Sequence, residues 1–307
     1  MERRALGPLE ITPVGVGTAP IGSDPSWYVY WGAQDERSSI AAIHRALDLG
    51  VNWIDTAPFY GWGRAEEVVG RALKGRHDDV LVFTKCGTFR NRDGSSFMDL
   101  RPESIRGEIG GILKRLRRDH IDLLQLHDVD PATPIEETWG GVQDLIAEGV
   151  VRHGGISNHP AEDVERALAV GPVAALQYEY SLLRRGVEAQ LVPFAERHGL
   201  GILCWSPLAS GFVADNFNID TLEPDDFRRR HPFAQLELGP LRDVLRTVGE
   251  AHGRTSAQIA LAWLLTRSAV SGAIVGVRNE AEAEELPRAI DLQLRDDELA
   301  AIEAAVP

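Results

Sequence analysis

Ile121-Asp122-Leu123-Leu124-Gln125-Leu126-His127 is a run of mostly apolar residues at consecutive positions. Such a run is typical of a β-strand that is covered on both faces, because a half-exposed strand would alternate apolar and polar residues. The preceding segment, Pro102–Arg117, repeats apolar residues at steps of three and four, which predicts an amphipathic helix. Together the two segments predict a helix that packs against a buried strand.

Seven further runs of this kind occur along the chain, with amphipathic segments between them. Eight strand–helix units predict a parallel sheet, and eight strands close a barrel. We therefore expect an α/β fold, a (β/α)8 TIM barrel that forms a single domain over residues 1–307. A doubly wound sheet is the alternative, but the segment from Gly15 to Gly22 lacks the third glycine of its nucleotide-binding fingerprint. The seven runs are Val14–Gly17, Val51–Asp55, Val80–Lys85, Val151–Ile156, Val173–Gln177, Gly201–Trp205 and Gly272–Gly276.

Local sequence signals add detail to this prediction. Asp35 is expected to cap the helix that follows it, and Thr133 and Thr255 are each expected to open a capping box. The long gap before the last strand must hold two helices and an irregular loop over about residues 209–238. A loop of that length in a compact domain is usually functional.

The composition limits the classes of function. The chain has 307 residues, and 32 Lys and Arg against 46 Asp and Glu give a net charge of −14. This acidity argues against a nucleic-acid partner, which needs a basic surface, and the basic run Arg228–Arg230 is expected to be a solvated loop. Two cysteines, Cys86 and Cys204, are too few for a disulfide framework or a cysteine-rich zinc site. Because the N-terminus has no apolar core and no stretch is long enough to span a membrane, we expect no signal peptide, no membrane contact and a cytoplasmic location.

Three consecutive strands end in the polar side chains Asp55, Lys85 and His127. The carboxyl ends of parallel barrel strands meet at one mouth, so we expect these groups to lie together. Tyr60 follows the first of them in a turn-rich segment that can place it over the opening. Each residue alone also has a purely structural interpretation, as an ion pair or a satisfied histidine. Four complementary groups together favour a functional site.

The chemistry of these four groups is coherent. A tyrosine with a pKa near ~10 is a poor acid or base at neutral pH, and a nearby ammonium should lower that pKa. Asp55 would keep Lys85 charged and oriented, and His127 would hydrogen-bond a substrate oxygen. We therefore predict proton transfer to or from a carbonyl or alcohol oxygen, with Tyr60 as the general acid. A reduction would also need a nicotinamide, because no side chain supplies a hydride.

The same residues carry a resemblance to the aldo-keto reductases, and it extends from about Gly15 to Leu286. The resemblance implies a (β/α)8 barrel without a metal, a catalytic tetrad of the four residues above, and an extended NADP(H) across the barrel mouth. The segments that resemble the family's signatures are Asp55–Glu66, Thr84-Lys85, the strand that ends in His127, Gly149–Asn158, Gly276-Val277-Arg278 and the long-loop stretch Asp225–Phe233, which is similar to the bacterial members.

The resemblance also implies which residues hold the cofactor and the substrate. Cofactor contacts are expected at the ends of six of the strands, and substrate contacts are expected from aromatic residues on the loops after the first three strands, where core packing is the alternative role. The expected cofactor residues are Gly17, Thr18 and Asp55; Ser157, Asn158 and Gln177 at the nicotinamide carboxamide, with Trp205 stacked on the ring; Ser206, Pro207, Leu208, Ser210 and Gly211 at the pyrophosphate; and Gly276, Arg278, Glu282 and Glu285 at the adenosine end. The expected substrate residues are Trp27, Trp31, Phe59 and Phe89, with Tyr28 beside them.

The adenosine end departs from the family pattern at Glu282, where glutamine is common near the 2′-phosphate and a carboxylate would repel that phosphate. Alternatively, Asn279 and Glu282 form a capping box in which Glu282 turns back to the Asn279 amide. Arg278 still offers a planar cation for adenine or for a phosphate. We therefore predict NADP(H) over NAD(H), with NAD(H) possible.

Taken together, these residues predict an enzyme that reduces small aldehydes, ketones or sugars to alcohols. Two alternatives stay open: an aldose or pyridoxal-type alcohol dehydrogenase that works in the oxidative direction, and a nicotinamide-binding regulatory subunit. A metal-dependent hydrolase that uses His127, Asp128 and Asp130 is a weaker alternative, because no His-x-His pair completes its ligand set. The partner is expected to be a small carbonyl or alcohol, and the oligomeric state stays open.

Overall fold

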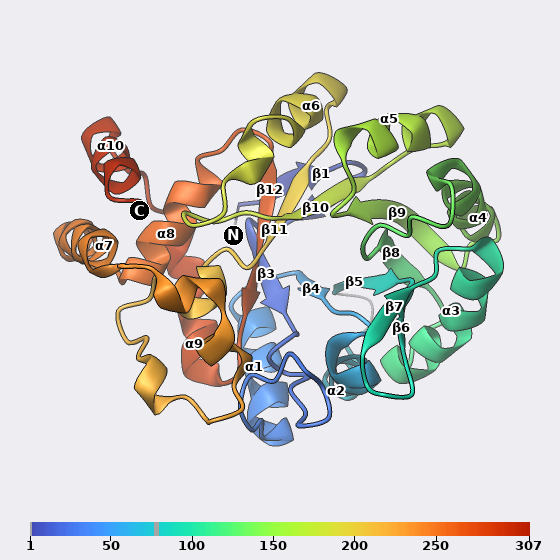
Figure 1. Ribbon diagram of the computed structural model, residues 1–307, viewed down its shortest axis with the longest axis horizontal. Coiled ribbons are helices and arrows are strands. Elements are labelled where there is room, and N and C mark those ends of the chain that lie inside the picture. The colour runs from blue at the N-terminus through green and yellow to red at the C-terminus, as the bar shows by residue number, and fades with distance from the viewer. Residues whose placement is uncertain (1, 77–79) are drawn as a thin grey trace.

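The computed structural model describes residues 2–76 and 80–307. Eight parallel strands form a closed barrel in chain order, and the helices surround it (Figure 1). The predicted fold class is confirmed, and the closed barrel excludes the doubly wound alternative. No predicted strand boundary lies more than two residues from the observed one. The barrel strands are β3 (Val14–Gly17), β4 (Trp53–Asp55), β5 (Leu81–Cys86), β8 (Ile121–Leu126), β9 (Val151–Ser157), β10 (Ala175–Glu179), β11 (Ile202–Trp205) and β12 (Val270–Gly276).

The helices cover the outside of the barrel with their apolar faces. On α3, the predicted face with Ile105, Ile109 and Ile112 is buried against the barrel and its neighbours. Two helices stand in the long gap between β11 and β12, as predicted. The helices are α1 (Glu36–Asp48), α2 (Arg64–Ala72), α3 (Pro102–Leu116), α4 (Ile135–Ala147), α5 (Ala161–Val170), α6 (Leu191–His198), α7 (Gly239–His252), α8 (Ser256–Leu265), α9 (Glu280–Glu285) and α10 (Asp296–Ala304).

A second, smaller core fills the inside of the barrel. Trp53 is its largest side chain, and it occupies the space beside Gly15, where a Cβ atom would lie only 2.2 Å from the indole. The amino ends of the strands are closed by an antiparallel hairpin, β1 (Arg4–Leu6) and β2 (Leu9–Ile11), which contributes Leu6 and Ile11 to this core. The inside of the barrel is therefore filled and closed at its amino end.

Two antiparallel hairpins were not predicted from the sequence. The first closes the bottom of the barrel, and the second, β6 (Thr88–Arg90) and β7 (Ser96–Met98), follows β5 at the mouth. Each of their strands has only three residues, too short for an alternating pattern to stand out.

Two of the three predicted helix caps are confirmed. The Asp35 side chain accepts a hydrogen bond from the Ser38 amide at the start of α1, and Thr255 forms a reciprocal capping box at the start of α8. The predicted capping box at Thr133 is wrong. Pro134 is the N-cap of α4, and the Thr133 hydroxyl donates instead to the buried carboxylate of Asp130 at 2.7 Å, because a charged acceptor makes the stronger hydrogen bond.

The long loop over residues 209–238 is irregular, as predicted, and contains four short 3-10 turns: η4 (Ala209–Gly211), η5 (Ile219–Thr221), η6 (Phe227–Arg230) and η7 (Pro232–Gln235). It reaches the loop between β3 and α1. Glu223 accepts a hydrogen bond from the Tyr30 hydroxyl at 2.7 Å and from the Ala33 amide at 2.8 Å. In Figure 1 it runs from α7 past α9 toward the blue N-terminal segment. The loop therefore crosses one side of the barrel mouth.

Among the helices in the described part of the chain, none is long and apolar enough to cross a membrane. The predicted cytoplasmic location stays a prediction.

Candidate active site

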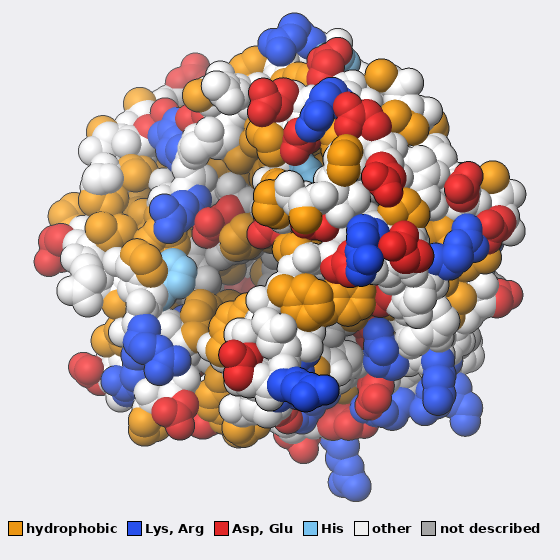
Figure 2. Space-filling view, turned by 45° about the vertical axis from the view of Figure 1, so that its right-hand side comes forward, with side chains coloured by type: hydrophobic (Ala, Val, Ile, Leu, Met, Phe, Trp, Pro, Cys, Tyr) orange, Lys and Arg blue, Asp and Glu red, His pale blue; other side chains and the backbone are white. Residues whose placement is uncertain are grey.

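A cavity of about 1130 Å³ opens at the carboxyl ends of the barrel strands. In the space-filling view, a hollow lies near the middle of the molecule with hydrophobic side chains at its edge (Figure 2). Asp55, Tyr60 and His127 line the cavity, and Lys85 lies behind Asp55 with 1% of its side chain exposed. The structure thus brings together the four groups that the sequence placed at neighbouring strand ends.

Asp55 and Lys85 form a buried ion pair beneath the cavity. Asp55 is the last residue of β4, and its Oδ1 lies 2.5 Å from Lys85 Nζ on β5. The ammonium also donates to the Thr56 carbonyl at 3.0 Å. Burial alone would lower the pKa of Lys85, but the charge of Asp55 and the contact with Tyr60 outweigh burial and leave that pKa raised. Lys85 therefore stays charged at neutral pH.

Gln125 is a part of the site that sequence reasoning missed. Its Nε2 donates to Asp55 Oδ2 at 3.2 Å, and Gln177 Nε2 donates to the same oxygen at 2.8 Å. Gln177 also donates to Gln125 Oε1 at 2.9 Å, so the two amides and the carboxylate form one buried network. The sequence signal that could have indicated this role is the amide side chain of Gln125 within the otherwise mostly apolar run of β8. The network fixes Asp55.

Tyr60 lies at the start of η1 (Tyr60–Gly63), directly after β4, and lines the cavity. The Lys85 ammonium is 4.9 Å from the centroid of its ring. Burial is the largest influence on the pKa of Tyr60 and raises it above its ordinary value of 10.0; the Lys85 charge opposes this shift, and the Asp55 charge adds to it. The predicted lowering of this pKa is therefore wrong, because the loss of water around the phenol outweighs the ammonium.

His127 follows β8 and lies edge-on to two aromatic rings. Its ring centroid is 5.9 Å from that of Tyr60 and 5.6 Å from that of Phe59. Burial, and secondly the Lys85 charge, hold the pKa of His127 well below 6.5, so the imidazole is neutral at pH 7. Its Nδ1 is buried and has no hydrogen-bond partner within the described residues. A neutral imidazole can donate one hydrogen bond to a ligand oxygen.

The floor of the cavity fits the carboxamide of a nicotinamide. The buried Ser157 hydroxyl lines the cavity and has no hydrogen-bond partner within the described residues. Next to it, the Asn158 amide donates to the His127 carbonyl at 3.0 Å and accepts from Trp205 Nε1 at 3.1 Å, which fixes the indole beside the opening. A hydroxyl without a partner in the described part of the chain and an oriented indole provide a hydrogen bond and the flat face that such a ring needs.

Backbone strain gathers in the segments that follow β9 and β11. Six non-glycine residues of the described chain have positive φ, and four of them are Asn158, Ser206, Ala209 and Ser210. Each costs energy relative to an ordinary conformation, and such residues cluster at ligand sites. The Ser210 amide donates to the Ser206 hydroxyl at 3.0 Å, which closes the turn after β11 around the cavity.

All other predicted cofactor residues lie on the cavity wall, and so do three of the four predicted substrate residues. Phe89 does not line the cavity; it stands on β6 and packs on Phe97 of β7, with ring centroids 5.7 Å apart. The cofactor residues on the wall are Gly17, Thr18, Asp55, Ser157, Asn158, Gln177, Trp205, Ser206, Pro207, Leu208, Ser210, Gly211, Gly276, Arg278, Glu282 and Glu285, and the substrate residues are Trp27, Trp31 and Phe59. Their individual roles stay predictions.

At the far end of the cavity, half of the predicted capping box is present. The Asn279 side chain accepts from the Glu282 amide at 2.9 Å, as predicted. Glu282 does not return to the Asn279 amide. Its carboxylate accepts instead from the Arg278 amide at 2.8 Å and from the Arg278 guanidinium at 2.7 Å, because that residue offers a positive charge as well as an N–H group.

The long loop contributes cavity residues that the sequence did not single out. Arg228 belongs to the run expected to be solvated, yet it is only 6% exposed and lines the cavity, which corrects that expectation. Its guanidinium pairs with Asp226 at 2.6 Å and lies 5.2 Å from the centroid of the Trp31 ring. Phe227 and His231 of the same loop also line the cavity, as do Glu179, the last residue of β10, and Arg184 beyond that strand.

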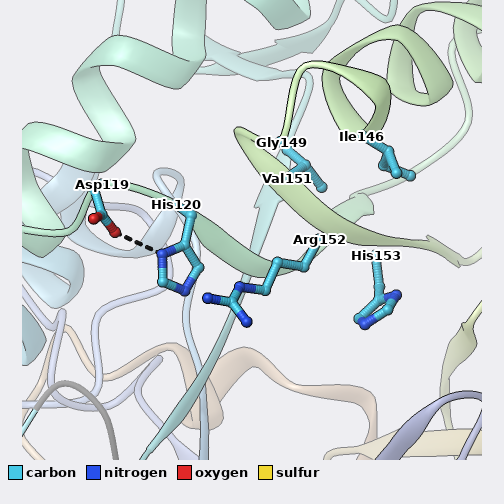
Figure 3. Close-up of a pocket in the computed structure, with 7 residues that line it drawn as sticks. All are labelled: Asp119, His120, Ile146, Gly149, Val151, Arg152 and His153. Atoms are coloured by element: carbon cyan, nitrogen blue, oxygen red, sulfur yellow. Dashed lines mark hydrogen bonds and ion pairs between the residues drawn. The ribbon is translucent and has the colours of Figure 1, made fainter.

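A second depression lies at the amino ends of the barrel strands, far from these groups (Figure 3). It contains none of the predicted site residues, and Asp119 pairs there with His120 at 2.6 Å. Side chains at this end of a TIM barrel usually serve stability. The lining residues are Asp119, His120, Ile146, Gly149, Val151, Arg152 and His153.

No three His, Cys, Asp or Glu side chains within residues 2–76 and 80–307 are grouped so that they could hold a metal ion. Asp130, which the hydrolase alternative requires, instead accepts hydrogen bonds from the Leu100 amide at 2.9 Å and from the Thr133 hydroxyl at 2.7 Å.

Comparison with known proteins agrees with this architecture. The model of the "Aldo/keto reductase family" matches residues 13–307. The NADH-specific methylglyoxal reductase of Escherichia coli (strain K12) is 32% identical over 96% of this chain and 95% of its own length. The glycerol dehydrogenase AKR11B4 of Gluconobacter oxydans has 33% sequence identity and a TM-score of 0.88, covering 99% of this chain and 94% of its own. An aldo/keto reductase of Klebsiella pneumoniae, in complex with NADP and acetate, has 27% identity and a TM-score of 0.79, covering 100% and 96%.

The chain belongs to the aldo/keto reductase family. It is therefore an oxidoreductase of carbonyl and alcohol groups with a nicotinamide cofactor, NADP(H) or NAD(H).

Proposed function

We propose that this protein is a reductase that converts a small aldehyde, ketone or sugar to the alcohol, with Tyr60 as the general acid. The observation that carries the proposal is the position of Tyr60 on the cavity wall. The centroid of its ring lies 4.9 Å from the ammonium of Lys85, which is itself paired with Asp55. When bound, the dinucleotide supplies the hydride.

Each residue of the tetrad then has a defined task. Tyr60 gives its proton to the substrate oxygen, and the buried Lys85 ammonium stabilises the phenolate that remains. Neutral His127 donates a hydrogen bond to the same oxygen and fixes its approach. Asp55, held by two glutamine amides, keeps Lys85 charged and in place.

The direction of the reaction is supported by the raised pKa of Tyr60. A phenol that stays protonated at neutral pH is ready to donate a proton to a carbonyl. Oxidation of an alcohol would need the phenolate as a base, and burial disfavours that form. We therefore propose reduction as the activity at neutral pH, where the phenol carries the proton that a carbonyl needs; the equilibrium between carbonyl and alcohol sets the net direction.

Trp27, Trp31 and Phe59 are proposed to bind the apolar part of the substrate. They line the cavity on the loops after β3 and β4, and Phe59 packs against both Trp27, at 5.2 Å between ring centroids, and His127. These rings would exclude water from the carbonyl during proton transfer.

The test is turnover of a simple aldehyde with NADH and with NADPH by the wild type and by Tyr60→Phe. We expect a loss of about 10²- to 10⁴-fold in kcat, because general acid catalysis contributes that much. Tyr180→Phe is the matched control: it also removes one phenol hydroxyl, which here bonds Glu188 at 2.7 Å, and it should retain activity. A wild type that binds the dinucleotide without turning over any carbonyl would favour the regulatory subunit instead.

A further inference from the structure

One arm of the cavity lies between β12, α8 and α9, away from the tetrad. If the proposed function is correct, the nicotinamide must reach Tyr60, so an extended dinucleotide places its adenosine end in this arm; the inference rests on that function. We call it the adenosine arm and define it by its lining residues, Thr255, Ala257, Gln258, Leu261, Gly276, Arg278, Ala281, Glu282, Glu285 and Leu286.

The charges of the adenosine arm are one cation and two carboxylates: Arg278 against Glu282 and Glu285. Glu285 Oε2 accepts a hydrogen bond from Gln258 Nε2 at 2.6 Å, and Glu285 has no cationic partner within the described residues. The arm as a whole therefore carries a negative charge, which opposes a phosphate of about −2 and does not oppose a neutral ribose hydroxyl.

The single cation of the arm is already occupied. Glu282 accepts hydrogen bonds from three nitrogens of Arg278: the backbone amide at 2.8 Å, Nε at 3.1 Å and Nη2 at 2.7 Å. The Nε and Nη2 atoms form the edge of the guanidinium that would otherwise grip a phosphate with two parallel hydrogen bonds. The side chains of Arg278 and Glu282 are 38% and 32% exposed, so a ligand can reach the guanidinium and compete with Glu282 for it.

A phosphate that displaced the Glu282 carboxylate from Arg278 would still have carboxylates nearby, because Glu282 and Glu285 both belong to the short helix α9. A ribose hydroxyl, in contrast, can donate a hydrogen bond to that carboxylate, and an acidic residue at the ribose is the usual partner of NAD in dinucleotide sites. We infer that Glu282 is a coenzyme-selectivity residue: it withholds Arg278 from a 2′-phosphate, so that the protein binds NAD(H) at least as tightly as NADP(H). The sequence-based prediction is a preference for NADP(H) with NAD(H) possible, and Glu282 is the residue on which this proposal departs from it.

The inference is tested by titrating the intrinsic tryptophan fluorescence with NADH and NADPH. For the wild type we expect the Kd for NADH to be equal to or below that for NADPH. In Glu282→Gln the Kd for NADPH should fall by about tenfold, while that for NADH changes less than about threefold. Glu284→Gln is the matched control, because it also removes one carboxylate from α9. The Glu284 carboxylate pairs with Arg45 at 2.8 Å, and Glu284 does not line the cavity.

A double-mutant cycle assigns the gain to the freed guanidinium. Arg278→Met alone should change the Kd for NADPH little, and in the Glu282→Gln background it should abolish the gain. NADPH binding more than about tenfold tighter than NADH binding in the wild type, or no gain in Glu282→Gln, overturns the inference. If neither dinucleotide binds, the proposed function fails together with the inference. If both dinucleotides bind and Tyr60→Phe loses turnover, but the expected differences in Kd are absent, then only the role of Glu282 is refuted.

Discussion

At the scale of single residues, the ion pair of Lys85 and Asp55 determines the chemistry of Tyr60. Each of the two side chains is 1% exposed, and a buried charge is costly unless it is paired and hydrogen-bonded. Asp55 Oδ1 provides the pairing, and the Thr56 carbonyl provides a second hydrogen bond. The ammonium therefore persists beside a phenol that burial keeps protonated.

We expect the rate of carbonyl reduction to be independent of pH between about 7 and 9. The pKa of Tyr60 is raised above 10.0, so the acid stays protonated in this window, and the pKa of His127 lies well below 6.5, so the imidazole stays neutral. At pH values above its raised pKa Tyr60 loses its proton, so reduction should decline there, and alcohol oxidation, which needs the phenolate, should rise. The measurement is kcat/KM in both directions from about pH 6 to 11.

A different profile would contradict this assignment. If reduction declined with an apparent pKa of about 8, Tyr60 would have to be acidified by Lys85 more strongly than burial opposes it.

At the scale of secondary-structure elements, α2 and α3 approach each other closely at Gly70, a residue of α2 that has no side chain. A Cβ atom on Gly70 would lie 2.2 Å from the Arg115 carbonyl oxygen, which is backbone and cannot turn away. The same region anchors the site, since Glu66 of α2 accepts hydrogen bonds from Thr84 on β5 and from Arg115 on α3, each at 2.7 Å. Packing of α2 on α3 thus supports the strand that carries Lys85.

Gly70→Ala should therefore destabilise the protein by about 1–3 kcal/mol, because the added methyl group overpacks this contact. Gly107→Ala is the matched control on α3: a Cβ there meets no atom within 4 Å, so it should stabilise the helix by about 0.5–1 kcal/mol. The free energies of unfolding from urea titrations compare the two variants. Equal stability of wild type and Gly70→Ala would show that the two helices can move apart at no cost.

At the scale of the whole molecule, the long loop joins two segments of the barrel mouth that follow β11 and β3, the strands on either side of β12. Besides the two hydrogen bonds of Glu223, the Phe227 amide donates to the Tyr30 carbonyl at 2.9 Å, and the rings of Phe227 and Trp31 lie 4.6 Å apart. The hydrogen bond to Glu223 also raises the pKa of Tyr30 to about 12. The contacts tie the segment after β11 to the segment after β3, so this side of the cavity is held in one arrangement.

Glu223→Ala removes both side-chain hydrogen bonds of this contact. We expect the backbone amides of residues 218–230 to exchange with deuterium about tenfold faster, with no change in the barrel strands, because the loop opens without unfolding the core. Hydrogen-exchange mass spectrometry measures this. Asp225→Ala, two residues away on the same exposed turn, is the control and should leave the exchange rates as they are. Uniform acceleration across the barrel would instead mean that the contact stabilises the whole fold.

Much of the fold could be predicted because strands and helices leave local patterns. Consecutive apolar residues and steps of three and four depend only on near neighbours, so all eight barrel strands and the buried face of α3 were found. The order of strands in a parallel barrel also places Asp55, Lys85 and His127 at one mouth without further information. The short hairpins escaped, since three-residue strands carry too little pattern.

By itself, then, the sequence determined the barrel and the four groups that meet at its mouth. Only the tertiary structure decided the direction of the pKa shift of Tyr60, the burial of Arg228 and the partner of Glu282. The physical reason is that burial and competition for a hydrogen bond depend on every group nearby in space. Those groups come from distant parts of the chain, and no local pattern records how close they approach.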